Sequence, residues 1–271
     1  MYFKLKNGEE TYYEDVGNGP DTLVMSTGWT MSHDTFTKPS KDLKDIARCI
    51  SYDNRGHYLS KNANSEHVTI ETLASDLNEL IEGLDLHDIT LLGWSMGVSV
   101  VLTYVRMYGC ERLKQIILCD MTPNNINDDN WHLGLRHGTY TKETVEAEKD
   151  KPFFWHYKGF VIEAVPKLKY APAFLLDPAL KKKLKNCDER ILNELSVSMN
   201  EQDNRDVLPM ISVPVSYFYA DPGACFMEEL AEWYGENVKV PYKAVAFKNA
   251  DHMFPEYREK EFVAEIRKLL G

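Results

Sequence analysis

Short apolar runs alternate with helical patterns through the first half of the chain, and this alternation limits the fold more than any other feature of the sequence. Such alternation is typical of a parallel sheet covered by helices. Between the second and third runs, apolar residues at helical spacing form one stripe, which has to face that sheet. The runs expected to be strands are Thr22–Ser26, Ala47–Tyr52, Ile89–Leu92 and Gln115–Cys119. The stripe consists of Ile70, Leu73, Leu77, Leu80, Ile81 and Leu84.

Both ends of the chain extend the pattern. Near the N-terminus, Phe3–Lys6 and Thr11–Val16 alternate polar and apolar side chains on either side of Asn7-Gly8. This arrangement predicts an antiparallel hairpin at the edge of the sheet. Near the C-terminus, strands are expected at Val213–Ala220 and Tyr242–Phe247, followed by a helix that starts near Pro255.

The alternation stops over residues 122–206, where the sequence becomes helical, charged and rich in bulky aromatic side chains. We therefore expect an α/β core made of residues 1–121 and 207–271, interrupted by a helical insertion at 122–206. The aromatic side chains either pack within the insertion or line an apolar pocket above the carboxyl edge of the sheet. They are Trp131, Tyr140, Phe153, Phe154, Trp155, Tyr157, Phe160, Tyr170 and Phe174.

Composition excludes several classes of protein. Of the 271 residues, 44% are hydrophobic and 27% are charged, which indicates a globular chain rather than a disordered or low-complexity one. Because 42 acidic residues outnumber 31 lysines and arginines, the net charge of −11 disfavours nucleic acids and anionic membranes as partners. A small-molecule substrate is the expected partner, and a homodimer is left open.

Cysteine spacing and the first residues bear on cofactors and compartment. The five cysteines show no CxxC spacing, so neither a metal site nor a disulfide framework is expected. Gly17-Asn-Gly19 leads into a strand instead of a helix, which argues against a nucleotide-binding loop. No cofactor is therefore expected. The N-terminus turns polar at once and no run reaches the roughly 18 apolar residues of a membrane span, so a cytoplasmic location is predicted.

The strongest chemical signal is Gly93-Trp-Ser-Met-Gly97. It lies between a predicted strand and a helix that is apolar almost all round, which should be the most buried helix of the fold. In this context a GxSxG pattern places its serine on a strained turn, where small neighbours are needed because backbone atoms approach closely. The N-terminus of the following helix also stabilises negative charge. Ser95 is therefore the candidate nucleophile.

A serine hydroxyl needs a base to take its proton. His252 lies after the last predicted strand and before the C-terminal helix, which places it at the carboxyl edge beside Ser95. His57 also follows a strand, but for this residue a role in bracing its loop is favoured. The other histidines are expected to be surface or packing residues, namely His33, His67, His87, His132, His137 and His156.

In these motifs and in their order, the chain resembles the α/β-hydrolase superfamily over essentially its whole length. It looks most like the small esterase and non-haem haloperoxidase-like branch. The resemblance implies a mostly parallel sheet flanked by helices, with residues 122–206 as an inserted helical cap and residues 53–60 as a structural loop near the oxyanion site. The motifs are Thr27-Gly-Trp29, Asp53–Ser60, Gly93–Gly97, Asp120–Pro123 and Ala250-Asp-His252.

The same resemblance implies an oxyanion hole made by two backbone N–H groups, those of Trp29 and Met96. Relatives usually carry His-Gly where this chain has Thr27-Gly28. Neither N–H depends on a histidine side chain, so both donors should survive this departure.

Two aspartates are candidates for the acid that orients the histidine. In most relatives an aspartate stands about three residues after the strand that ends at Ala220, but that position is Gly223 here. Asp221 lies two residues early, and Asp120 ends the preceding strand, where some relatives place the acid. Both stay open, with Asp120 preferred because the end of a strand holds the direction of a side chain better than a loop does.

Two classes of function remain. The first is a serine hydrolase that cleaves carboxylic esters or related acyl bonds of small neutral or apolar substrates. Carbon–carbon bond hydrolysis and cofactor-free perhydrolysis would use the same residues. The second is a hydrolase-like protein that binds a ligand without efficient turnover. Dehalogenation and epoxide opening are disfavoured, because relatives with those activities carry an aspartate where this chain has Ser95.

Overall fold

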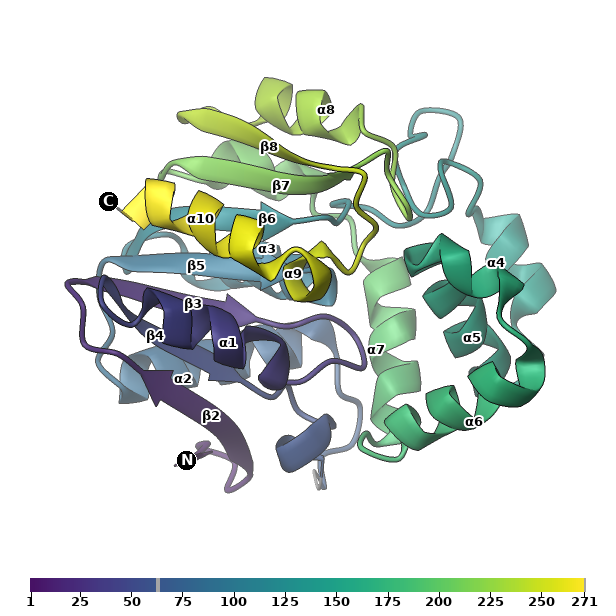
Figure 1. The fold of residues 1–271 in the computed structure, drawn as a ribbon, viewed down its shortest axis with the longest axis horizontal. Coiled ribbons are helices and arrows are strands. Elements are labelled where there is room, and N and C mark those ends of the chain that lie inside the picture. Colours follow the sequence, from purple (N-terminus) through teal and green to yellow (C-terminus); the bar gives the residue numbers. More distant parts are fainter. Residues whose placement is uncertain (62–63, 271) are drawn as a thin grey trace.

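The computed structural model describes residues 1–61 and 64–270, which form an eight-stranded sheet with helices on both faces (Figure 1). The strands are β1 (Tyr2–Lys4), β2 (Glu10–Val16), β3 (Asp21–Ser26), β4 (Ala47–Tyr52), β5 (Ile89–Trp94), β6 (Leu113–Cys119), β7 (Val215–Asp221) and β8 (Tyr242–Lys248). Their order in the sheet is β1-β2-β4-β3-β5-β6-β7-β8. β2 pairs antiparallel with β1 and β4, and the remaining neighbours are parallel.

The helices are α1 (Asp34–Leu43), α2 (Ile70–Gly83), α3 (Met96–Tyr108), α4 (Lys142–Glu148), α5 (Phe153–Ala164), α6 (Ala173–Leu184), α7 (Glu189–Glu201), α8 (Leu230–Asn237), α9 (Phe254–Tyr257) and α10 (Glu259–Leu270). Short 3₁₀ helices span Tyr58–Ser60, Pro166–Tyr170 and Arg205–Met210. Within residues 1–61 and 64–270, no helix combines the length and apolar character that a bilayer crossing requires.

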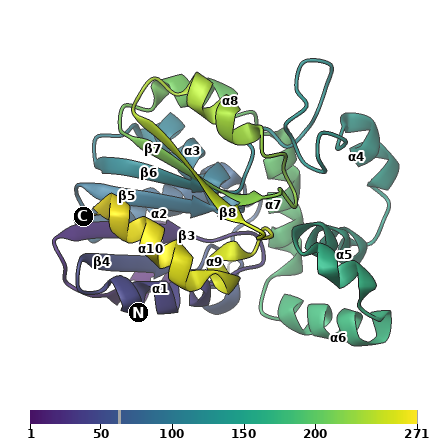
Figure 2. The same cartoon turned by 45° about the horizontal axis from the view of Figure 1, so that its top comes forward.

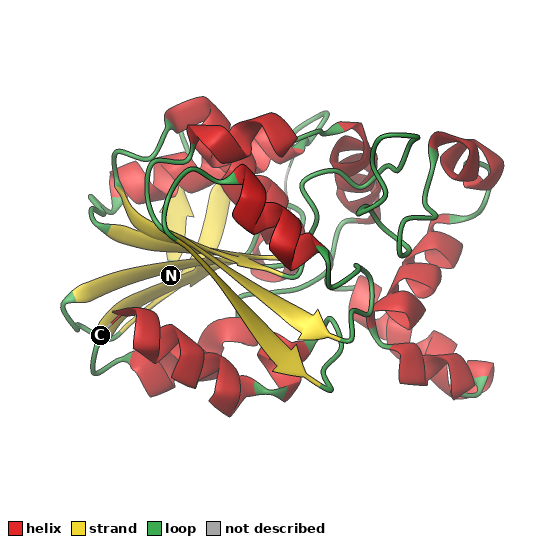
Figure 3. Ribbon diagram, turned by 90° about the horizontal axis from the view of Figure 1, so that it is seen from above, coloured by secondary structure: helices red, strands yellow, loops and turns green. Residues whose placement is uncertain are grey.

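Helices cover both faces of the sheet (Figure 3), and an apolar core lies on each face. On one face α2 packs on α3, with Leu77 and Val101 fully buried, and α8 contributes side chains to the same core beside β7 and β8. On the other face α1 and α10 contribute Phe36 and Phe262, whose rings stack with centroids 6.3 Å apart. Every residue of β5 is buried, as expected for a central parallel strand covered on both sides.

Helices α4 to α7 all come from the segment between β6 and β7, and they lie beyond the carboxyl ends of the central strands (Figures 1 and 2). Helix α7 is tied to the core by Ile191, Leu192 and Leu195, all with no exposed surface. At the end of α5, the carbonyl of Ala164 accepts a hydrogen bond of 3.2 Å from the backbone N–H of His252. This segment therefore contacts the loop that carries the candidate base.

The strands, the edge hairpin and α2 lie where the sequence predicts them, within one or two residues. The α3 prediction is also confirmed, since all ten positions from Met96 to Val105 are buried. The expectation of a single C-terminal helix from near Pro255 is wrong. Arg258 leaves the helical conformation (φ −112°, ψ 33°) and separates α9 from α10. Before the break, Phe254 stacks on Phe247, with centroids 4.2 Å apart, and after it Phe262 of α10 packs against both rings in the same core.

Two glycines permit the tight passage from β5 into α3. A Cβ atom on Gly97 would overlap the carbonyl oxygen of Ser26 in β3, and one on Gly93 would overlap the carbonyl of Gly97. Both obstacles are backbone atoms, which cannot rotate aside. The small residues of the GxSxG pattern are therefore required by the packing of α3 against the sheet.

We predict that Gly97→Ala lowers the free energy of unfolding by about 2 kcal/mol, because overpacking against backbone forces α3 away from β3. Urea unfolding followed by circular dichroism measures this. Gly159→Ala in α5 is the matched control, since a Cβ there meets nothing within 4 Å. Alanine favours a helix by about 1 kcal/mol over glycine, so the control should keep or raise stability. Equal loss in both variants would contradict the packing argument.

Candidate active site

Ser95 is the single residue between the end of β5 and the start of α3. Its backbone has φ 55° and ψ −125°, a region that side-chain-bearing residues rarely occupy and that often marks functional turns. The side chain is almost buried, with 6% of its surface exposed. A Cβ on Gly28 would lie 3.1 Å from the Cβ of Ser95, so the loop after β3 passes directly beside the serine.

His252 and Asp120 form a buried pair at the carboxyl edge of the sheet. Nδ1 of His252 lies 2.7 Å from Oδ2 of Asp120, and 2% of either residue's surface is exposed. The second carboxylate oxygen accepts the backbone N–H of Ala220 at 3.1 Å, which holds the carboxylate in place. Nε2 of His252 is buried and has no hydrogen-bond partner among the described residues. The ring therefore keeps one nitrogen available for a proton.

Asp221, the alternative acid, has a different partner. Its carboxylate pairs with Lys248 in β8, and its carbonyl accepts the backbone N–H of Asn249 at 2.6 Å. The structure brings Asp120 to His252 and leaves Asp221 at the end of β7, paired with the edge strand β8. Of the two candidates, Asp120 alone is bonded to the imidazole among the described residues.

The backbone N–H groups of Met96 and Trp29 are free to meet a ligand. Met96 is the first residue of α3, where N–H groups have no partner within the helix. Among the hydrogen bonds of the described residues, none uses the N–H of Met96 or of Trp29. The indole of Trp29 donates to the carbonyl of Leu192 in α7 at 3.0 Å, which anchors this residue.

His57 braces the loop that carries Trp29. Its Nε2 accepts the backbone N–H of Thr30 at 3.1 Å, and its Nδ1 lies 3.0 Å from the carbonyl oxygen of Arg55. Burial lowers the pKa of His57, which favours the neutral ring that this pattern requires. Asn54 adds a second link, from its Nδ2 to the carbonyl of Thr27 at 3.3 Å. Both nitrogens of His57 are thus engaged away from the serine.

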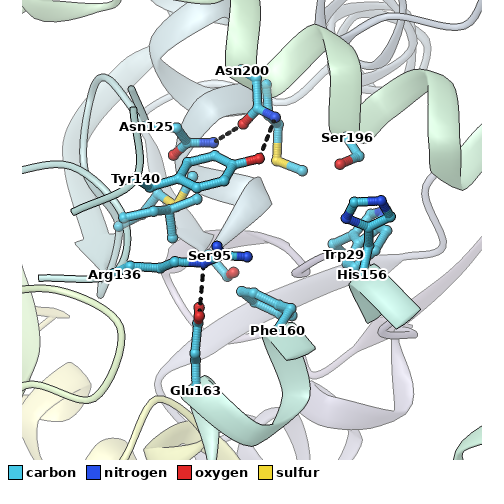
Figure 4. A pocket seen from close by; sticks show the side chains of 13 residues that line it. Trp29, Ser95, Asn125, Arg136, Tyr140, His156, Phe160, Glu163, Ser196 and Asn200 are labelled. Carbon is cyan, nitrogen blue, oxygen red and sulfur yellow. Dashed lines mark hydrogen bonds and ion pairs between the residues drawn. The ribbon is translucent and has the colours of Figure 1, made fainter. Parts of the chain in front are cut away.

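Ser95 lies between two cavities that share Trp29, Ser95 and Phe160 in their walls. The first encloses an empty space of about 660 Å³, its open mouth included, and is lined by both polar and apolar side chains (Figure 4). The second, of about 700 Å³ on the same measure, also contains His252 and is mostly apolar. Its apolar wall consists of Tyr157, Val161, Ala164, Val165, Leu168, Leu180 and Met253.

Several residues of these walls have no signal in the sequence. Arg136, Glu163 and Asn125 line the first cavity, although none belongs to a recognisable motif. His156, expected at the surface or in packing, lines the same cavity. Three aromatic residues of the segment line neither cavity and are exposed. The exposed side chains are Trp155 at 44%, Tyr170 at 86% and Phe174 at 76%.

Within the described residues, no group of three histidine, cysteine, aspartate or glutamate side chains is arranged to hold a metal ion. The five cysteines are free and buried. At the carboxyl edge the structure brings together the hydroxyl of Ser95, the imidazole of His252 paired with a carboxylate, and unpaired backbone N–H donors. This combination is suited to acyl transfer.

The sequence model of a protein family described as the alpha/beta hydrolase fold matches residues 21–154. The chain belongs to the α/β-hydrolase family. The matched region runs from β3 through Ser95 into the segment after β6.

Relatives of this α/β hydrolase include both esterases and haloperoxidases. It is 34% identical over 150 residues to a non-haem chloroperoxidase of Kitasatospora aureofaciens, which covers 51% of this chain and 54% of that protein. The chain spans about half the length of the curated relatives it matches. An esterase from Exiguobacterium antarcticum has a similar structure, with a TM-score of 0.83, 24% identity, and 100% and 98% of the two chains covered. A bromoperoxidase from Bacillus anthracis gives a TM-score of 0.80 at 22% identity, with 96% and 95% covered.

We predict that His57 makes the fold less stable in acid. Because burial lowers its pKa below the ordinary value of about 6.5, the unfolded chain binds a proton between these two pKa values that the folded chain does not. Stability from this source is therefore lost as the pH falls below about 6.5, by roughly 1 kcal/mol per pH unit.

His57→Gln should remove this contribution while still offering an acceptor to the N–H of Thr30. The measurement is the free energy of unfolding in urea at pH 7.5 and 5.5, for the wild type and the variant. His87→Gln is the control, because that ring is exposed beside Asp85. If the wild type and His57→Gln lost the same stability on acidification, the assignment would be wrong.

Proposed function

We propose that this chain is a serine hydrolase that cleaves carboxylic esters or related acyl bonds through an acyl-enzyme on Ser95. The observation that carries the proposal is the buried His252–Asp120 pair, 2.7 Å apart, beside a serine with strained backbone. A structural histidine would use both ring nitrogens, as His57 does, whereas Nε2 of His252 has no partner among the described residues. Membership of the α/β-hydrolase family supports the same reaction class.

The proposed reaction begins when Oγ of Ser95 attacks the ester carbonyl carbon while its proton passes to Nε2 of His252. Asp120 holds the ring through Nδ1 and stabilises the imidazolium that forms. The N–H groups of Met96 and Trp29 stabilise the negative oxygen of the tetrahedral intermediate, helped by the N-terminus of α3. The imidazolium then protonates the leaving alcohol. Water, deprotonated by His252, releases the acid from the serine.

We further propose that the segment at 122–206 acts as a cap on a core made of residues 1–121 and 207–271. Its helices contribute walls to both cavities beside Ser95, through α5, α6 and α7. The apolar cavity supports the expectation that at least one part of the substrate is small and uncharged. A small-molecule substrate is the partner that this arrangement favours.

Perhydrolysis is a second candidate, favoured by the haloperoxidase names among the relatives. In that reaction hydrogen peroxide takes the place of water and attacks the same acyl-enzyme, giving a peracid and free serine. Formation of peracetic acid from acetate and hydrogen peroxide, detected by bromination of monochlorodimedone, tests it. Hydrolysis of esters at a far higher kcat/KM than perhydrolysis would leave esterase as the main activity.

We predict that Ser95→Ala abolishes both ester hydrolysis and covalent labelling by a fluorophosphonate probe. The change removes one oxygen atom at the carboxyl edge and no core volume, so the thermal unfolding midpoint should stay within a few degrees. p-Nitrophenyl esters of increasing acyl length supply the rates. Residual kcat/KM above about one-thousandth of wild type would exclude Ser95 as the nucleophile. An unlabelled wild type would favour the non-catalytic, ligand-binding alternative.

We predict that Asp120→Asn lowers kcat at least about 1,000-fold, because an amide favours the wrong tautomer of His252 and does not stabilise its charged form. Asp221→Asn is the matched control and should stay within about twofold of wild type, since its carboxylate faces Lys248. Pre-steady-state measurement of p-nitrophenol release reports the acylation rate in each variant. A larger loss in Asp221→Asn than in Asp120→Asn would reverse the assignment.

A further inference from the structure

The wall of the first cavity contains part of a charged cluster, in which Arg136 and Glu163 line the cavity and Glu148 pairs with Arg136 behind it. The wall of the second cavity has one charged side chain of each sign, Lys183 and Glu256. In the cluster, Nε of Arg136 lies 2.8 Å from Oε1 of Glu163 (Figure 4). The other edge of the guanidinium donates to both oxygens of Glu148, at 2.7 and 3.0 Å. Burial raises the pKa of Glu163, so its carboxyl group is ionised most fully in alkaline solution. With both carboxylates ionised, one positive charge is shared between them, which leaves a net charge of −1 for this cluster.

Arg136 has little freedom to recognise an anionic substrate. Its edges are occupied by Glu148 and Glu163, and one face of its guanidinium lies 4.7 Å from the ring centre of Tyr140. Glu163 comes from α5, and its side chain is 30% exposed, so its carboxylate is accessible from the cavity. Of this pair, the carboxylate is the group that remains open to a ligand.

The neutral polar groups of this cavity add no positive charge. Nδ2 of Asn125 donates to Asn200 at 3.3 Å, and Nδ2 of Asn200 donates to the hydroxyl of Tyr140 at 3.1 Å. Burial raises the pKa of Tyr140, which therefore stays an uncharged phenol at neutral pH. Oδ1 of Asn125 is a buried acceptor without a partner among the described residues.

Aromatic rings complete the surroundings of Glu163. Trp29 and Phe160 line the same cavity, and Phe160 lies on the same helix as Glu163. Aromatic faces attract cations, and a carboxylate beside them strengthens the attraction in a partly buried site. A cavity with these groups is suited to an organic ammonium.

We propose that the cavity lined by Glu163 selects esters that carry a positively charged amine group, with the apolar cavity holding the uncharged part of the same substrate. This inference rests on the proposed esterase function. Under this proposal, the expectation of an uncharged substrate applies only to the part of the substrate that lies in the apolar cavity. A carboxylate in place of the amine would be repelled by Glu163.

The kinetic test compares esters that have the same shape but differ in charge. Butyrylcholine, whose charge lies in the alcohol part, is paired with its neutral isostere 3,3-dimethylbutyl butyrate. The ethyl ester of 4-(trimethylammonio)butyrate, whose charge lies in the acyl part, is paired with its neutral isostere ethyl 5,5-dimethylhexanoate. For at least one pair we expect the kcat/KM of the cationic ester to exceed that of its neutral isostere about tenfold. The assay runs at about pH 8.5, where the side chain of histidine is ordinarily uncharged and adds no positive charge to a cavity wall.

Glu163→Gln should bring the ratio of kcat/KM between the cationic ester and its neutral isostere close to one. The amide keeps the shape of the side chain and removes its charge. Glu256→Gln is the matched control, since Glu256 lines the second cavity and not the first. It should keep the ratio of the wild type. Absence of a preference in the wild type for both pairs, or a preference that survives in Glu163→Gln, would overturn the proposal.

A binding measurement separates this inference from the proposed function. Calorimetry on Ser95→Ala measures the Kd of phenyltrimethylammonium, and competition with this probe measures that of neutral tert-butylbenzene. We expect the cation to bind about tenfold more tightly, and Glu163→Gln in the same background to remove the difference. If no ester is cleaved but this difference is found, the esterase proposal fails and the cation site stands. Equal binding of the two probes overturns the cation site, whatever the esterase activity.

Discussion

The close approach of α3 to β3 at Gly97 is the contact on which the rest of the site depends. Because Gly97 has no side chain, the first turn of α3 reaches the backbone of Ser26. That approach places Ser95 at the carboxyl edge with a backbone conformation that a regular helix or strand does not supply. Met96 is the first residue of α3, so its N–H has no partner within the helix, and the same turn positions both the proposed nucleophile and the proposed backbone donor.

The imidazole beside this turn is held from several directions. The backbone N–H of Ala220 orients the carboxylate of Asp120, and the indole of Trp94 donates to the carbonyl of His252 at 3.1 Å. Ala164, at the end of α5, accepts the backbone N–H of the same histidine. The loop after β8 is therefore tied to the sheet and to the inserted helices together. Burial of the ring and its carboxylate makes each of these hydrogen bonds stronger than it would be in water.

The segment between β6 and β7 forms part of the walls of both cavities beside Ser95. It supplies apolar walls on one side of Ser95 and a charged cluster on the other. The cluster joins Arg136 and Glu148 near α4 to Glu163 in α5. In the proposed enzyme, the core would perform the chemistry and this segment would choose the substrate, because cavity walls can change without disturbing the turn at Ser95.

The sequence by itself determined the sheet, α3, the serine turn and the two candidate acids, because periodicity and close backbone packing are properties of neighbouring residues. It did not determine the break at Arg258, which depends on how Phe254 and Phe262 share one core. It favoured Asp120 over Asp221 but left both open, and it gave no sign that Glu163 lies beside Arg136. These contacts join residues from different loops and helices, and small changes in the path of each segment decide which side chains meet. Only the tertiary structure set those paths, since local propensity carries no information about distance across the fold.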